Sequence, residues 1–103
     1  MSDLAKLQPQ FDFILMAVKA YDTQWVSKFA SVYLKDKGVF VGLQNAYNDD
    51  LNADMVGREN VIGAVVELSC EIFNPGFVQR NTVPSGTWFA VGELSGKITP
   101  RLK

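Results

Sequence analysis

The 103-residue sequence contains no histidine and a single cysteine. Without histidine, the chain lacks the side chain that most often acts as a general base and the commonest metal ligand. One cysteine excludes an internal disulfide and a metal site built from several thiolates. Ten basic and eleven acidic residues give a formal net charge of −1. This balance indicates neither a nucleic-acid partner nor an anionic membrane surface.

Long hydrophobic runs are also missing. The run over residues 13–18 is about a third of the roughly 18 residues that span a bilayer. The preceding ten residues lack the basic start of a secretory signal. We therefore expect no membrane segment and a cytoplasmic location, and a virus-encoded protein would look the same. Because 48% of the residues are hydrophobic, the sequence predicts one folded domain over residues 1–103.

The N-terminal third has the spacing of a helix. Apolar residues recur there every three or four positions, which is the pattern of one helical face. Because proline suits the first turn of a helix, we predict a helix from about Pro9 to residue 21. Asp22 and Thr23 both favour N-cap positions. A second helix is therefore predicted over residues 23–35.

The segment over residues 57–73 fits two structures. As a strand, residues 66–72 alternate between apolar and polar positions. As a helix, a polar stripe at spacings of three and four runs through about fifteen residues. The longer pattern favours the helix. The other predicted elements are a strand over residues 39–41, a loop over 45–54, and a C-terminal hairpin of strands 77–83 and 87–98 joined at residues 84–86.

Four stretches in this order resemble the NTF2-like superfamily, which includes SnoaL-like polyketide cyclases and ketosteroid isomerases. They are residues 21–29 at a helix–helix turn, 33–41 with a Y-x-x-D-x-x-V-F entry into a strand, 57–62 with a G-R-E-x-I helix start, and 70–77 at an exit into a strand. The resemblance spans residues 11–98 and implies an α+β fold. N-terminal helices would pack on a small, curved, antiparallel sheet of cone-like NTF2 type. With residues 60–73 as a strand, the alternative is helices plus a β-meander.

The NTF2-like resemblance carries over no catalytic residue, because the isomerase aspartate position falls at Val41 and Gly42 here. The sequence offers Glu93 as a weak catalytic candidate. In a strand Glu93 points the same way as Phe89 and Val91, and burial in a pocket there would raise its pKa. The competing interpretation leaves Glu93 in solvent.

A ligand pocket of apolar and aromatic side chains is also suggested. Its candidate lining residues are Tyr21, Trp25, Phe40, Arg80 and Trp88. Arg80 would bind a carboxylate or phosphate, or else lie on a solvated strand face. Each aromatic has a competing interpretation as plain core, and Trp88 is expected to be buried and structural.

The polar run that begins at Asn48 spaces oxygen side chains like a calcium loop up to Glu59. Ala53 occupies the position that needs glycine, so we predict a solvated loop and no metal.

The function expected is a small-molecule pocket for an apolar ligand. It would use acid–base chemistry of isomerase, cyclase or dehydratase type, without metal or organic cofactor. The alternative is a non-catalytic, self-associating assembly protein, of viral origin for example. Because the predicted sheet is small, we expect a homo-oligomer in either case.

Overall fold

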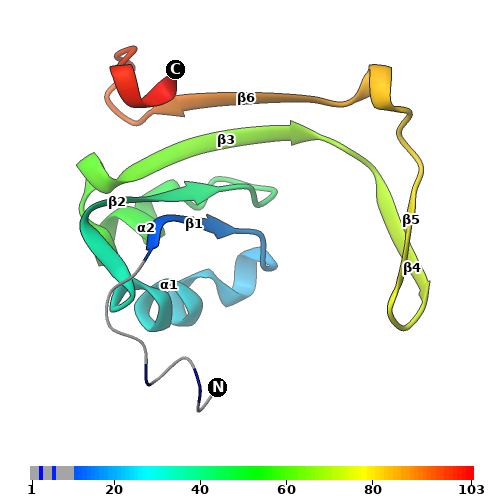
Figure 1. Ribbon diagram of the computed structural model, residues 1–103, viewed down its shortest axis with the longest axis horizontal. Helices are drawn as coiled ribbons and strands as arrows, with labels where there is room; N and C mark the ends of the chain where they lie inside the picture. The colour runs from blue at the N-terminus through cyan, green and yellow to red at the C-terminus, as the bar shows by residue number, and fades with distance from the viewer. Residues whose placement is uncertain (1–2, 4–5, 7–10) are drawn as a thin grey trace.

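The computed structural model describes residues 3, 6 and 11–103, which form a helix-backed sheet with a projecting arm (Figure 1). The elements in chain order are β1 (Phe11–Met16), η2 (Ala20–Asp22), α1 (Thr23–Ser31), β2 (Leu34–Gly42), α2 (Asp49–Val56), η3 (Arg58–Asn60), β3 (Val61–Glu67), β4 (Cys70–Asn74), β5 (Phe77–Arg80), η4 (Pro84–Gly86), β6 (Trp88–Glu93) and η5 (Pro100–Leu102). The main sheet has the strand order β1-β2-β3-β6, and β4 and β5 form a separate pair.

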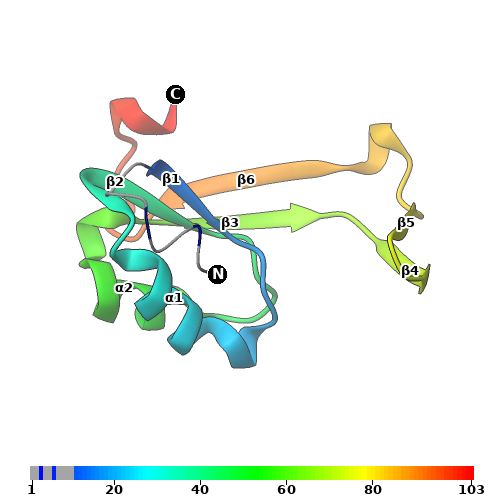
Figure 2. The same cartoon turned by 60° about the horizontal axis from the view of Figure 1, so that its bottom comes forward.

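The main sheet is mixed, which corrects the predicted antiparallel, cone-like NTF2 architecture. β1 pairs in parallel with β2, and β2 pairs in parallel with β3. Only β6 runs antiparallel, alongside β3. The physical reason is the connections: α1 and α2 each carry the chain back across the sheet, so consecutive strands start from the same edge. Figure 2 shows both helices on one face of the sheet.

The first predicted helix, over residues 9–21, is wrong where the structure describes it, and its first two residues lie outside the described part. β1 occupies this place instead. Its side chains alternate, so Ile14 and Met16 pack into the core while Phe13 and Leu15 are exposed. The apolar run over residues 13–18, which supplies most of β1, satisfies helical spacing and strand alternation equally well. Pairing with β2 decides between them, because it supplies the backbone hydrogen bonds of a strand.

The second half of the chain corrects two further predictions. The segment over residues 57–73 is not a helix, since it contains η3, β3 and β4, so the strand alternative is the right one there. The predicted C-terminal hairpin is also wrong. Residues 84–86 form η4, and the strands on either side of it take different partners: β5 pairs with β4, and β6 pairs with β3. The turn-forming residues 84–86 predicted that the chain would reverse direction there. They carried no information on the pairing partner of β6, which is the distant strand β3.

Two predictions from the N-terminal half are confirmed in substance. A helix does begin at Thr23, although it ends at Ser31, and the strand expected over residues 39–41 lies inside β2.

The core sits between the helices and the sheet. Its buried residues are Met16, Phe40, Ala53 and Val61, with Ile14, Val18, Val26, Ala30, Leu34, Val56 and Leu94 packed around them.

Beyond this core, β3 and β6 run on as a long ribbon that carries the β4–β5 pair at its far end (Figure 1). Every side chain of β4 and β5 is exposed. Trp88 is 49% exposed on this arm, so the prediction that it is buried is wrong. A two-stranded ribbon has no second layer to bury its apolar side chains against. No helix in the described part of the chain is long and apolar enough to cross a membrane.

Candidate functional site

The structure does not gather the ligand-binding residues suggested by the sequence. Tyr21 and Trp25 are exposed on η2 and α1, and Phe40 is completely buried in the core. Arg80 and Trp88 lie on the arm, where Arg80 hydrogen-bonds Thr87 instead of facing a cavity. These positions come from different parts of the fold, so a common pocket for them stays a prediction without geometric support.

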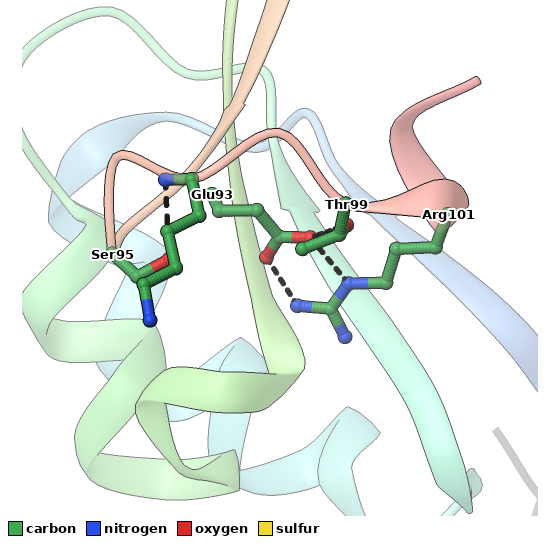
Figure 3. Close-up of polar contacts among 5 residues, drawn as sticks. Glu93, Ser95, Thr99 and Arg101 are labelled. Carbon is green, nitrogen blue, oxygen red and sulfur yellow. Dashed lines mark hydrogen bonds and ion pairs between the residues drawn. The ribbon is translucent and has the colours of Figure 1, made fainter.

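Glu93 ends β6 and holds the C-terminal turn η5 against the sheet (Figure 3). Its carboxylate accepts hydrogen bonds from Arg101 Nε at 2.7 Å, from Arg101 Nη2 and from Thr99 Oγ1. These donors, Arg101 first, lower the pKa of Glu93 to about 2 against the opposing effect of burial. The expected rise in pKa is therefore wrong. Glu93 lies in a depression of about 500 Å3, together with Arg58, Glu59, Ser95, Thr99 and Arg101.

A second cleft, of about 360 Å3, lies where parallel strands end. β2 ends at Gly42, and the loop that follows it forms one wall. The other wall comes from β3. The lining residues are Gly42, Leu43, Gln44, Asn45, Ala46, Tyr47, Asn48, Asp49, Gly63, Ala64, Val65 and Val66. In open α/β sheets, ligands bind in the crevice outside the carboxyl ends of the strands. The position of this cleft makes it the stronger candidate site.

A buried polar network shapes the loop of this cleft. Gln44 Nε2 donates to Thr23 Oγ1 at 2.6 Å, and Thr23 Oγ1 donates to the Ala20 carbonyl at 2.8 Å. Asn48 Nδ2 donates to the carbonyls of residues 45 and 46. Ala46 is held at φ 68°, a left-handed conformation that favours glycine. Backbone strain of this kind persists where the surrounding structure fixes it, often beside a ligand site.

Among the described residues that line the cleft, Asp49 supplies the only carboxylate, and none is a lysine or arginine. Burial raises the pKa of Asp49, the charge of Asp50 raises it further, and Arg58 opposes both. Arg58 itself is paired with Asp50 at 2.7 Å. A cleft lined by amides and one desolvated carboxylate suits hydroxyl and amide groups better than phosphate or carboxylate groups.

Sequence reasoning missed this cleft because it interpreted residues 45–54 as a solvated loop. In fact α2 begins at Asp49, which places that side chain over the sheet. The available signal was the run rich in Asn and Asp that begins at Asn45, three residues after β2 ends at Gly42. In the described part of the chain, no group of three or more Cys, Asp or Glu side chains is placed to hold a metal ion.

Comparison with known proteins gives a consistent picture. The model of a family described as ketopantoate reductase PanE/ApbA matches residues 2–94. The 2-dehydropantoate 2-reductase of Geobacter metallireducens GS-15 superposes with a TM-score of 0.77 at 23% identity, over 91% of this chain and 30% of that chain. The PanE/ApbA family ketopantoate reductase of Ralstonia eutropha JMP134 gives a TM-score of 0.62 at 28% identity, over 69% of this chain and 24% of that chain. No curated protein matches the chain.

These matches correct the NTF2-like resemblance. The four short stretches behind it carry little specificity, whereas one family model matches residues 2–94 and a solved structure superposes over 91% of this chain. The expected isomerase, cyclase or dehydratase chemistry rested on that resemblance and is therefore wrong. The matches do not support the alternative of a non-catalytic assembly protein either. The chain spans 30% and 24% of the lengths of the two solved proteins.

Proposed function

The chain belongs to the ketopantoate reductase PanE/ApbA family, and from this premise we propose that it forms part of an oxidoreductase that reduces the 2-oxo group of a small acid to an alcohol. The cleft at the carboxyl end of β2 is the part of the active site that this chain contributes. The observation that carries the proposal is the position of the cleft. It lies between β3 and the loop after β2, at the sheet edge where α/β proteins bind ligands.

The family implies a nicotinamide dinucleotide, NADPH, as cofactor. When bound, its nicotinamide supplies the hydride for such a reduction. The residues present fit one portion of that molecule. Gln44 Oε1 is a buried acceptor without a partner among the described residues, and with Asp49 it suits amide and hydroxyl groups. They do not fit the phosphates, since the cleft has no basic side chain and the sequence has no G-x-G-x-x-G loop.

Titration of the isotope-labelled chain with NADPH tests the proposal. We expect saturable shifts of the backbone amide signals of residues 42–49 and 63–66, which line the cleft. The signals of β4 and β5 serve as an internal control and should stay in place, because that pair is separate from the cleft. If the lining signals do not move at millimolar NADPH, or if all parts of the chain respond equally, the proposed binding role is wrong.

We also propose that the chain associates with itself in the cytoplasm, as the sequence led us to expect, and that the contact lies on the arm. Exposed apolar side chains of β6 support the association: Phe89 is 61% exposed and Val91 is 52% exposed. Both lie on the same face of the ribbon, since they are two residues apart in one strand. Contiguous exposed apolar surface of this kind is typical of contact sites between proteins.

A further inference from the structure

β6 is an edge strand of the main sheet, and its outer edge is open. The strand order is β1-β2-β3-β6, and within the described part of the chain β6 pairs with β3 alone. In Figure 1 the C-terminal turn borders this outer edge at one end of β6, and the rest of the edge faces solvent. Such an edge presents a row of unpaired backbone N–H and C=O groups. A second strand can therefore pair alongside β6.

β1, the other edge strand, carries features that discourage such pairing. Its register with β2 shifts within residues 11–13, and Asp12 in that stretch forms an ion pair with Lys35 at 2.9 Å. Irregular register and charged side chains are the usual protection of an exposed edge. β6 follows β3 without a register shift, and its one charged residue, Glu93, lies at its end and is bound by Arg101. The unprotected edge is thus β6.

The side chains of β6 are apolar and exposed on both of its faces. Phe89 and Val91 point to one face, and Trp88, which is half exposed, points to the other. Because one large aromatic side chain alone has about 150–250 Å2 of surface, two such strands edge to edge would bury on the order of 1,000 Å2, which is near the lower size limit of a specific interface. An interface of this size is typical of weak, reversible association.

We propose that β6 pairs antiparallel with β6 of a second copy of this chain, so that the two main sheets join into one continuous sheet across a two-fold axis. A second copy brings an identical apolar strand, so the pairing covers both exposed edges at once. The axis stands perpendicular to the sheet, and directly opposed residues therefore share a face. This inference rests on the proposed self-association through the arm, for which it names the surface and the register.

The side chains of β6 complement one another when Ala90 lies on the axis. Phe89 then stands opposite Val91 of the second copy, and an aromatic side chain beside a β-branched one stabilises a strand pair. Trp88 stands opposite Gly92 of the second copy. A Cβ on Gly92 would meet nothing within 4 Å, so the space for a bulky neighbour is open. An aromatic side chain across from an edge glycine shields the backbone that the glycine leaves bare.

Other registers fit less well. With Val91 on the axis, Phe89 would oppose Glu93 of the second copy, whose carboxylate is already held by Arg101. With Phe89 on the axis, half of β6 would extend past the end of its partner strand. An axis between two residues would oppose side chains of different faces, which a regular ladder does not allow. The pairing centred on Ala90 is therefore the register to test.

Disulfide cross-linking tests this register. In a Cys70→Ser background, which removes the one native cysteine, Ala90→Cys would place two thiols across the axis. Opposed Cα atoms in an antiparallel pair are about 4.5–5.5 Å apart, and disulfides form at about 4.4–6.8 Å. Mild oxidation should convert most of this variant into a covalent dimer.

Val65→Cys in the same background is the matched control. Val65 is exposed, pairs with Ala90 across the two strands, and lies on the same face. In the joined sheet, two copies of Val65 would be three strand spacings apart, roughly 14 Å. This separation is beyond the reach of a disulfide, so the control should stay monomeric on a non-reducing gel.

Hydrogen exchange of the wild-type chain gives a measurement that depends on no variant. The backbone amides of β6 that point to the open edge should exchange at least twofold more slowly at high than at low micromolar concentration, because pairing protects them. The amides of β1 are the control and should exchange at the same rate at both concentrations, since the proposed dimer leaves that edge uncovered.

The failures of the two proposals are distinguishable. If light scattering shows a dimer but Ala90→Cys cross-links no faster than Val65→Cys, or the β6 amides gain no protection, the edge pairing is wrong and the proposed self-association stands. Protection that appears on β1 instead also overturns the pairing through β6. If the chain stays monomeric at high micromolar concentration, both the pairing and the self-association are wrong.

Discussion

Replacing Glu93 with glutamine tests the ion pair that fixes the C-terminal turn to the sheet. The side chain of Glu93 is 5% exposed and that of Arg101 is 35% exposed. The pKa of Glu93 falls from 4.5 to about 2. At about 1.4 kcal/mol per pKa unit, this shift corresponds to at most about 3.5 kcal/mol of folding stability. Solvent reaches Arg101 and screens the pair, so we expect Glu93→Gln to lower the free energy of unfolding by about 1–2 kcal/mol at pH 7.

The pH dependence has a definite sign. Because the pKa of Glu93 is lower in the folded state, its stabilising contribution is fully present above the unfolded value of 4.5. It is lost as the pH falls from 4.5 through about 2. The difference between wild type and Glu93→Gln should therefore be largest at neutral pH and shrink towards zero at about pH 2.

Urea denaturation followed by circular dichroism, at several pH values, measures this difference. Glu71→Gln is the control, since Glu71 is exposed on β4 and makes no ion pair among the described residues. Its effect should be small and independent of pH. A Glu93 with a raised pKa would give the opposite sign, with the glutamine variant more stable at pH 7. That result, or equal stability of variant and wild type at pH 7, would refute the reasoning.

Three further outcomes are expected. Ala46→Gly should raise the free energy of unfolding by about 1 kcal/mol, because φ 68° at Ala46 strains any residue with a Cβ; a loss of stability in urea would contradict the loop geometry. Phe40→Ala should lower the free energy of unfolding by about 3–5 kcal/mol, because Phe40 is fully buried in the core. Trp88→Ala should lower it by less than half as much, because Trp88 is half exposed on the arm. Equal shifts of the melting temperature in the two variants would show that the arm is not exposed as described. Light scattering should show self-association at high micromolar concentration that Phe89→Lys abolishes; a strict monomer would argue against an interface on the arm.

The pKa of Glu93 could not be predicted from local sequence patterns. Alternation correctly put Glu93 in a strand beside Phe89 and Val91, but it contained no information on Arg101, eight residues later. The turn through residues 94–99 brings Arg101 back to the carboxylate. Whether a buried carboxylate has a raised or a lowered pKa depends on such a donor, so the sign could not be read from the strand alone.

The amino-acid sequence by itself determined features that depend on local chemistry. Asp22 and Thr23 marked a helix start, and the β-branched and aromatic run over residues 39–41 marked a strand. The alternation over residues 66–72 indicated extended structure there, although it runs across the break between β3 and β4. These signals need no partner, because capping and β-propensity act within a few residues.

Only the tertiary structure decided the rest. The run that forms β1 suits a helix or a strand, and parallel pairing with β2 made it a strand. The parallel pairing of β2 with β3 set Gly42 beside Gly63, twenty-one residues apart in the chain. This placed Asp49 over both glycines and turned an apparent solvated loop into the wall of a cleft. Register between strands is a long-range property, since it depends on which hydrophobic faces meet, and that choice is made when the core forms.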